Sequence, residues 1–148
     1  MDIISTILSL LGTGRDHAKR VNDRRAEVAR LNAEAAAEVG RALDILNAAR
    51  VRLFRRCAEV YPASSEMLET CKTALDLPLK DMTAFWDMTQ QLSGVIANGG
   101  WRADWETALQ RAYEMKGTST RFVPFISDIV GRLEAAIDAD EKLLGRPE

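Results

Sequence analysis

One stretch of the chain decides the fold: residues 13–61 read TGRDHAKRVNDRRAEVARLNAEAAAEVGRALDILNAARVRLFRRCAEVY. It contains no proline, and Gly40 is its one glycine after the opening turn. Because an α-helix rises about 1.5 Å per residue, a helix of this span would be about 70 Å long. Every other candidate helix is less than half that length, so we expect the rest of the chain to fold back along it.

The apolar residues of this stretch recur at a helical spacing. The mean step is about 3.56 residues, between the spacing of a coiled coil and that of a straight helix. The stripe consists of Val28, Leu31, Ala35, Val39, Ala42, Leu46, Ala49, Leu53, Cys57 and Val60. A second apolar row, Leu43, Phe54 and Tyr61, accompanies only its later half. We therefore expect two or more neighbours to cover the C-terminal half and at most one to cover the N-terminal half.

Prolines and glycines divide the remaining chain. The long helix should end at Tyr61, because the residue before Pro62 is pushed away from helical angles. Pro78 should kink or open a helix, and Asn98-Gly99-Gly100 should terminate one. These signals predict helices at about 65–77, 78–97, 101–116 and 124–145, with one real loop at 118–124. No strand-like alternation occurs.

The pattern predicts an all-α fold. We expect a helical bundle built on one very long N-terminal helix (about 13–61), with about four shorter helices packed back along it. A short amphipathic helix at residues 2–11 should precede the long one. The domain organisation is then a short N-terminal helix at 1–12 and a single helical-bundle domain at 13–148.

The charge of the chain is unevenly distributed. Of the 20 Lys and Arg and 22 Asp and Glu residues, residues 1–60 carry 11 basic and 8 acidic, whereas 61–148 carry 9 and 14. This asymmetry favours docking of a basic long helix on acidic return helices. Acidic residues interleaved through the basic run argue against nucleic acid as a partner. With two cysteines, no secretory signal and no apolar run of about 20 residues, we expect a cytoplasmic protein, with the inner face of a membrane as a further location.

The N-terminal segment is the most apolar short stretch. Five of its residues fall on one helical face: Ile3, Ile4, Ile7, Leu8 and Leu11. Gly12-Thr13-Gly14 should act as a hinge after it, and Thr13 with Asp16 resembles a capping box that opens the long helix. One interpretation packs the segment on the bundle or on a second copy of the chain. The other places its apolar face in an anionic membrane. The basic residues that would contact the headgroups are Arg15, Lys19, Arg20, Arg24 and Arg25.

Catalytic chemistry is poorly served by this sequence. His17 is the only histidine, and the residues near it in the sequence do not form a Ser-His or Cys-His arrangement. One histidine cannot supply the paired Glu-x-x-His ligands of a di-iron bundle, and the cysteine pair with one distant histidine fits zinc poorly. No glycine-rich loop matches a phosphate-binding fingerprint. We therefore expect a non-enzyme with no cofactor and no metal.

Two further clusters have both a structural and a functional interpretation. Cys57 and Cys71 lie seven residues on either side of Ser64, so a helical hairpin turning there would bring them together, either as core thiols or as a redox pair. The densest basic cluster is Arg50, Arg52, Arg55 and Arg56. These arginines either dock on acidic residues of the same bundle or bind an acidic partner or lipid headgroup.

The leading expectation is a non-catalytic helical interaction or adaptor module. It would bind a protein partner or a second copy through the N-terminal helix and the first half of the long helix, where the stripe is thin. In addition to the N-terminal apolar and basic residues, this surface would include Val21, Val28 and Leu31. The alternative is a peripheral membrane protein anchored by residues 1–12 and the adjacent basic residues.

Overall fold

The computed structural model describes the backbone of residues 3–61 and 65–145, and the side chains of 16–61, 65–100 and 102–145. It contains the α-helices α1 (Ile3–Val60), α2 (Glu66–Asn98), α3 (Trp105–Ser119) and α4 (Phe122–Leu144). A short 3-10 helix, η1 (Gly100–Arg102), precedes α3. Within these ranges no residue lies in a strand, so the predicted all-α helical bundle is confirmed.

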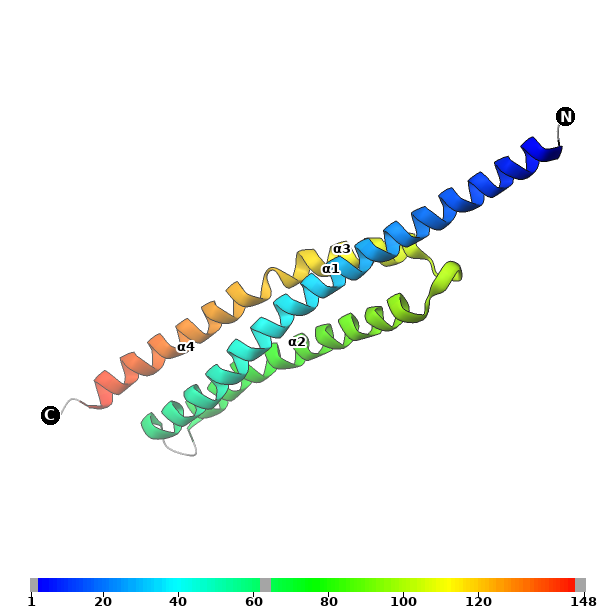
Figure 1. The fold of residues 1–148 in the computed structure, drawn as a ribbon. Helices are drawn as coiled ribbons and strands as arrows, with labels where there is room; N and C mark the ends of the chain where they lie inside the picture. Colours follow the sequence, from blue (N-terminus) through cyan, green and yellow to red (C-terminus); the bar gives the residue numbers. More distant parts are fainter. Residues whose placement is uncertain (1–2, 62–64, 146–148) are drawn as a thin grey trace.

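The helix α1 is the axis of the molecule, and the other helices pack along it (Figure 1). The helix α2 runs antiparallel to α1: Arg50, late in α1, pairs with Asp76, early in α2. Asn32, in the first half of α1, bonds to Ser93 near the end of α2.

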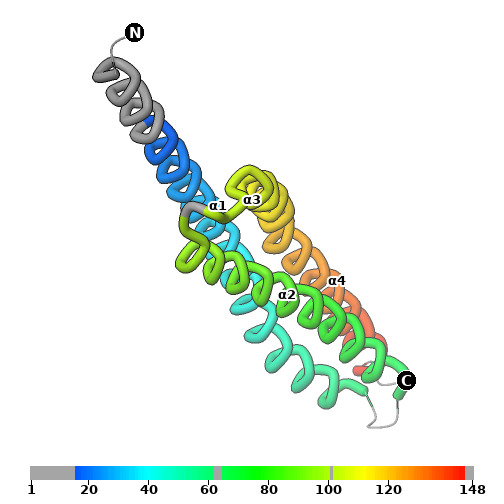
Figure 2. The backbone as a smooth tube through the Cα atoms, turned by 90° about the vertical axis from the view of Figure 1, so that its right-hand side faces the viewer, coloured from blue at the N-terminus to red at the C-terminus, as the bar shows by residue number. Residues whose placement is uncertain are grey.

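The helices α3 and α4 follow one another along α1 in its own direction, as both views of the backbone show (Figures 1 and 2). Glu34 of α1 pairs with Lys116 of α3, and Arg56 pairs with Asp138 of α4. The N-terminal and C-terminal ends of the chain consequently lie at opposite ends of the bundle (Figure 1).

The long helix is longer than predicted. It begins at Ile3 and continues through Gly12-Thr13-Gly14, so the predicted hinge, the separate 2–11 helix and the start at Thr13 are wrong. The physical reason is that each glycine costs a helix only about 1 kcal/mol relative to alanine, and no proline interrupts the segment.

The second correction concerns Pro78. The predicted helices 65–77 and 78–97 are one helix, α2, with Pro78 in its interior and buried. Leu75 and Met82, on either side of it, are also buried on the same face. Continuous packing on α1 thus outweighs the hydrogen bond that proline cannot donate. Ser65 caps α2, accepting a bond from the Leu68 backbone N–H at 3.3 Å.

The predicted loop at 118–124 is also wrong. Only Thr120 and Arg121 separate α3 from α4, and α4 begins at Phe122. Pro124 therefore lies in the first turn of α4. The first four backbone N–H groups of a helix have no partner within it, so proline loses nothing there.

The core follows the predicted stripe of α1. Val28, Ala35, Val39, Leu46 and Leu53 are all fully buried. The expectation of at most one neighbour along the N-terminal half is wrong, because both α2 and α3 cover it. Small residues on α1 and α3 explain why the narrow apolar stripe of α1 is nevertheless well buried, because they permit the two helices to approach closely. Examples are Ala35 on α1 and Ala112 on α3, each with no exposed surface.

Candidate interaction site

The N-terminal end of α1 extends beyond the ends of α2 and α3 (Figure 1). The end of α2 is marked by Arg25, whose guanidinium donates to the carbonyl of Ala97 at 3.3 Å. The start of α3 is marked by Arg24, which forms an ion pair with Glu106. We term residues 3–20 of α1, N-terminal to these contacts, the projecting segment.

The sequence-predicted contact residues differ in their surroundings in the structure. Val28 and Leu31 are buried in the chain's own core and are not available to a partner, which corrects their assignment. Val21 is half-buried against the core. Lys19 and Arg20 are exposed.

Two further predicted contact residues, Arg24 and Arg25, bond to Glu106 and Ala97 of the same chain, as described above. Six predictions lie outside the residues whose side chains are described: Ile3, Ile4, Ile7, Leu8, Leu11 and Arg15.

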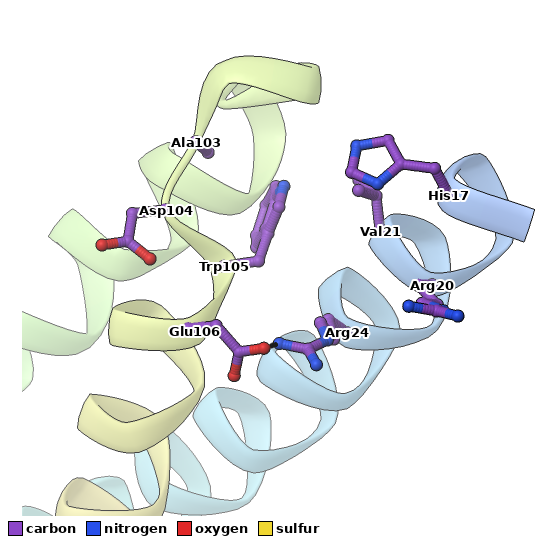
Figure 3. A pocket seen from close by; sticks show the side chains of 8 residues that line it. All are labelled: His17, Arg20, Val21, Arg24, Ala103, Asp104, Trp105 and Glu106. Carbon is purple, nitrogen blue, oxygen red and sulfur yellow. Dashed lines mark ion pairs between the residues drawn. The ribbon is translucent and has the colours of Figure 1, made fainter. Parts of the chain in front are cut away.

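An open pocket of about 320 Å³ lies at the base of the projecting segment (Figure 3). Its first wall comes from α1 and consists of His17, Arg20, Val21 and Arg24. Its second wall comes from the start of α3 and the residues before it, and consists of Ala103, Asp104, Trp105 and Glu106. The pocket therefore has cationic side chains on one wall and carboxylates on the other.

The polar groups of the second wall already have structural roles. Asp104 caps α3: its Oδ1 accepts from the Thr107 backbone N–H at 3.1 Å and its Oδ2 from the Thr107 hydroxyl at 2.7 Å. These bonds, that of the Thr107 hydroxyl first, lower the pKa of Asp104. The indole of Trp105 donates to the carbonyl of Gly100 at 2.9 Å. These bonds fix the start of α3, and the Arg24–Glu106 ion pair joins it to α1. The exposed cation in the pocket is Arg20, on the projecting segment.

The arginine cluster at 50–56 makes ion pairs within the chain. Arg50 pairs with Asp76 of α2 at 2.5 Å, and Arg52 pairs with Glu134 of α4. Arg55 lies 3.7 Å from Glu59 on the same helix. The interpretation in which these arginines dock on acidic residues of the same bundle is the one that the structure supports.

Arg56 makes the most connected of these ion pairs. Its guanidinium donates to Asp138 at 2.6 Å and to Glu141 at 3.0 Å, both on α4. We expect Arg56→Ala to lower the free energy of unfolding measurably, because it removes two ion pairs to α4 and the packing of the side-chain stem. Arg55→Ala is the matched control and should change it by less than about 0.5 kcal/mol. Urea denaturation of the two variants measures both values, and equal effects would contradict the assignment.

The two cysteines are brought together, as the hairpin argument predicts. The Sγ atoms of Cys57 and Cys71 lie 2.9 Å apart, and both residues are buried free thiols. Cys57 lies near the C-terminal end of α1 and Cys71 near the N-terminal end of α2. This end of the bundle is opposite to the projecting segment (Figure 1).

A buried polar contact between α1 and α2 was missed by sequence reasoning. Asn32 is 3% exposed, and its Nδ2 donates to the carbonyl of Thr89 at 3.0 Å and to the Ser93 hydroxyl at 2.9 Å. The sequence feature that could have indicated this contact is the polar residue Asn32, which directly follows Leu31 of the apolar stripe. Such a contact is satisfied in only one alignment of the helices, so it fixes the register of α2 on α1.

The described part of the chain contains neither a cluster of metal ligands nor a helix that could span a membrane. No group of three or more His, Cys, Asp or Glu side chains there could hold a metal ion. No described helix is both long enough and apolar enough to cross a bilayer.

Comparison of the chain with protein-family models, curated proteins and solved structures finds no match.

Proposed function

We propose that this chain is a non-catalytic helical interaction module that self-associates through the projecting segment of α1. The observation that carries the proposal is the continuation of α1 N-terminal to Val21, the first described apolar residue of this helix that packs against the core. A helix that leaves its own bundle is stabilised when an apolar face on it packs against another surface, because short isolated helices are marginal in water.

The sequence pattern of the projecting segment supports a protein surface as that partner. Ile3, Ile7 and Leu11 recur at a four-residue spacing, which favours one apolar helical face. Because α1 has no break at 12–14, this face belongs to the same rigid helix as the core stripe. Two such segments packed together would extend the bundle by a helix pair, in the manner of a coiled coil.

The experiment is a comparison of two lysine variants that differ by one position in the projecting segment. Leu8→Lys changes the predicted apolar face, whereas Ser9→Lys adds the same charge on the opposite face. We expect Leu8→Lys to weaken self-association at least about tenfold, since a charge buried in an apolar contact is costly, and Ser9→Lys to change it less than about twofold. Sedimentation velocity over a range of protein concentrations gives both dissociation constants. Circular dichroism checks that both variants remain helical.

A mass corresponding to the monomer at about 100 µM protein would contradict self-association, because interfaces that function in oligomers bind more tightly than this. Equal weakening by Leu8→Lys and Ser9→Lys would show that charge in general, and not the apolar face, controls the association.

A second candidate function is peripheral binding to an anionic membrane. It is favoured by Lys19 and Arg20, which are exposed on the same continuous helix as the apolar segment. Each cation near an anionic surface contributes about 1 kcal/mol. In this case wild-type protein should co-sediment with phosphatidylserine vesicles but not with neutral ones, and Leu8→Lys should abolish the binding. Equal binding by wild type and Leu8→Lys would exclude insertion of the segment.

A further inference from the structure

The two cysteine thiols form the closest pair of reactive side chains in the described core. Their Sγ atoms are 2.9 Å apart, about 0.9 Å more than the roughly 2.0 Å of a disulfide bond. Cys57 is fully buried and Cys71 is 3% exposed. The two sulfurs therefore need to approach each other by only about 0.9 Å to reach bonding distance.

The backbone holds both cysteines in ordered helix. Cys57 lies in the last turns of α1, and its carbonyl accepts a bond from the Tyr61 N–H at 2.8 Å. Cys71 lies in the second turn of α2, after the Ser65 cap. The helices on which they lie pack antiparallel, so the Cys57–Cys71 contact depends on the hairpin being closed.

Burial controls how these thiols react. Desolvation, and then the neighbouring Cys57 thiol, raise the pKa of Cys71 to about 12. The thiolate is the form that attacks a disulfide, so a thiol with a high pKa reacts slowly while it stays buried. Access by an oxidant or a reductant then requires local separation of α1 and α2 at this end of the bundle.

We propose that Cys57 and Cys71 are an oxidation site, at which an intramolecular disulfide joins the C-terminal end of α1 to the N-terminal end of α2. The oxidant class is a low-molecular-weight disulfide. The site is independent of the projecting segment, which lies at the other end of the bundle. A failure of this proposal would therefore not contradict the proposed function, and the reverse also holds.

The reaction is a two-step thiol–disulfide exchange. One cysteine thiolate attacks a sulfur of the small disulfide, forms a mixed disulfide and releases one small thiolate. The second cysteine thiolate then attacks the protein sulfur of the mixed disulfide and releases the other small thiolate. The protons lost by the two cysteines are taken up by the released thiolates. The protein loses two electrons and two protons, and the small disulfide gains them.

The closed ring spans residues 57–71, and cross-linking a ring of about 15 residues restricts the unfolded chain far more than the folded one. The disulfide should therefore stabilise the folded state by the same free energy by which folding favours disulfide formation, because the two equilibria are linked. We expect the oxidised protein to melt about 6–12 °C above the reduced protein.

The test equilibrates the full chain with glutathione and its disulfide in native buffer and, at the same ratio, in denaturant. Starting from both reduced and oxidised protein shows that equilibrium is reached. After acid quenching, mass spectrometry separates the dithiol, the intramolecular disulfide, which lacks two hydrogens, and the glutathione adduct. We expect the ratio of intramolecular disulfide to dithiol to be at least about tenfold higher in native buffer than in denaturant.

Controls separate proximity from general reactivity. Cys57→Ala and Cys71→Ala each retain one thiol, so neither variant can form the intramolecular disulfide. Each should be found either as the reduced thiol or as the adduct with one glutathione. A native ratio equal to or below the denatured ratio in the wild type, or a predominance of glutathione adducts or intermolecular dimers, would overturn the proposal. Since this readout uses wild-type protein, loss of folding in an alanine variant does not affect it.

Discussion

Replacing Leu53 by alanine is expected to lower the free energy of unfolding by about 2–5 kcal/mol, the range for removing a large buried aliphatic side chain. Leu53 has no exposed surface and lies in the α1 stripe where α2 and α4 both cover it. The variant loses the transfer free energy of the side chain and leaves a cavity that a closely packed helix cannot fill by collapsing.

The matched control for this prediction is Val51→Ala on the same helix. Val51 is 76% exposed, so its truncation should change the free energy of unfolding by less than about 0.5 kcal/mol. Urea denaturation followed by circular dichroism gives both values. A loss below about 1 kcal/mol for Leu53→Ala would mean that α2 and α4 do not pack closely over this position.

Replacing Gly99 by alanine is expected to destabilise the turn between α2 and α3. A Cβ atom at this position would lie 2.6 Å from the carbonyl oxygen of Val95 and 2.8 Å from the Cβ of Ala103. The nearest of these is a backbone atom of α2, which cannot move aside as a flexible side chain does. Since overpacking typically costs 1–3 kcal/mol, we expect a loss of about that size.

The control is Gly94→Ala, five residues earlier in α2. A Cβ atom at Gly94 would meet no atom within 4 Å, and the position lies in a helix interior. Alanine is the better helix former there, so this variant should raise the free energy of unfolding by about 0.5–1 kcal/mol. The two glycine variants thus differ in sign. A stabilising Gly99→Ala would show that α2 and α3 are connected differently.

The all-α class and the core stripe of α1 could be predicted from the sequence because helical periodicity is a local property of a long, proline-free segment. The Cys57–Cys71 contact was also predictable, since two positions equidistant from a hairpin turn must lie side by side. The pairing of Arg50, Arg52 and Arg56 with α2 and α4 agrees with the charge asymmetry of the two halves.

The predicted helix boundaries are wrong where a single glycine or proline was given too much weight. Glycines at 12 and 14 were interpreted as a hinge and Pro78 as a helix boundary, and the last helix was predicted to begin only at Pro124, yet all four residues lie inside helices. Their local costs are smaller than the packing that a continuous helix gains, or vanish in a first turn. Local propensity could not reveal this, because the compensating contacts come from segments far away in the chain.

The burial of Val28 and Leu31 was not predictable for a related reason. The narrow stripe around them indicated one neighbour, whereas alanines on facing helices allow two helices to approach closely. Such shape complementarity depends on both facing helices, so it cannot be predicted from the sequence pattern of one helix alone. The pocket beside Arg20 likewise exists only because the start of α3 meets α1.

The single helix α1 also sets a distance. Its 58 residues correspond to about 87 Å at the usual helical rise. Tyr61, just after its end, donates a hydrogen bond to Asp140 at 2.5 Å, so the end of α4 is held beside the end of α1. Molecules attached at the two ends of this chain would therefore be separated by nearly the full helix length. In this respect the fold has the geometry of a stiff spacer, whose length depends on the continuity of one helix and not on a linker.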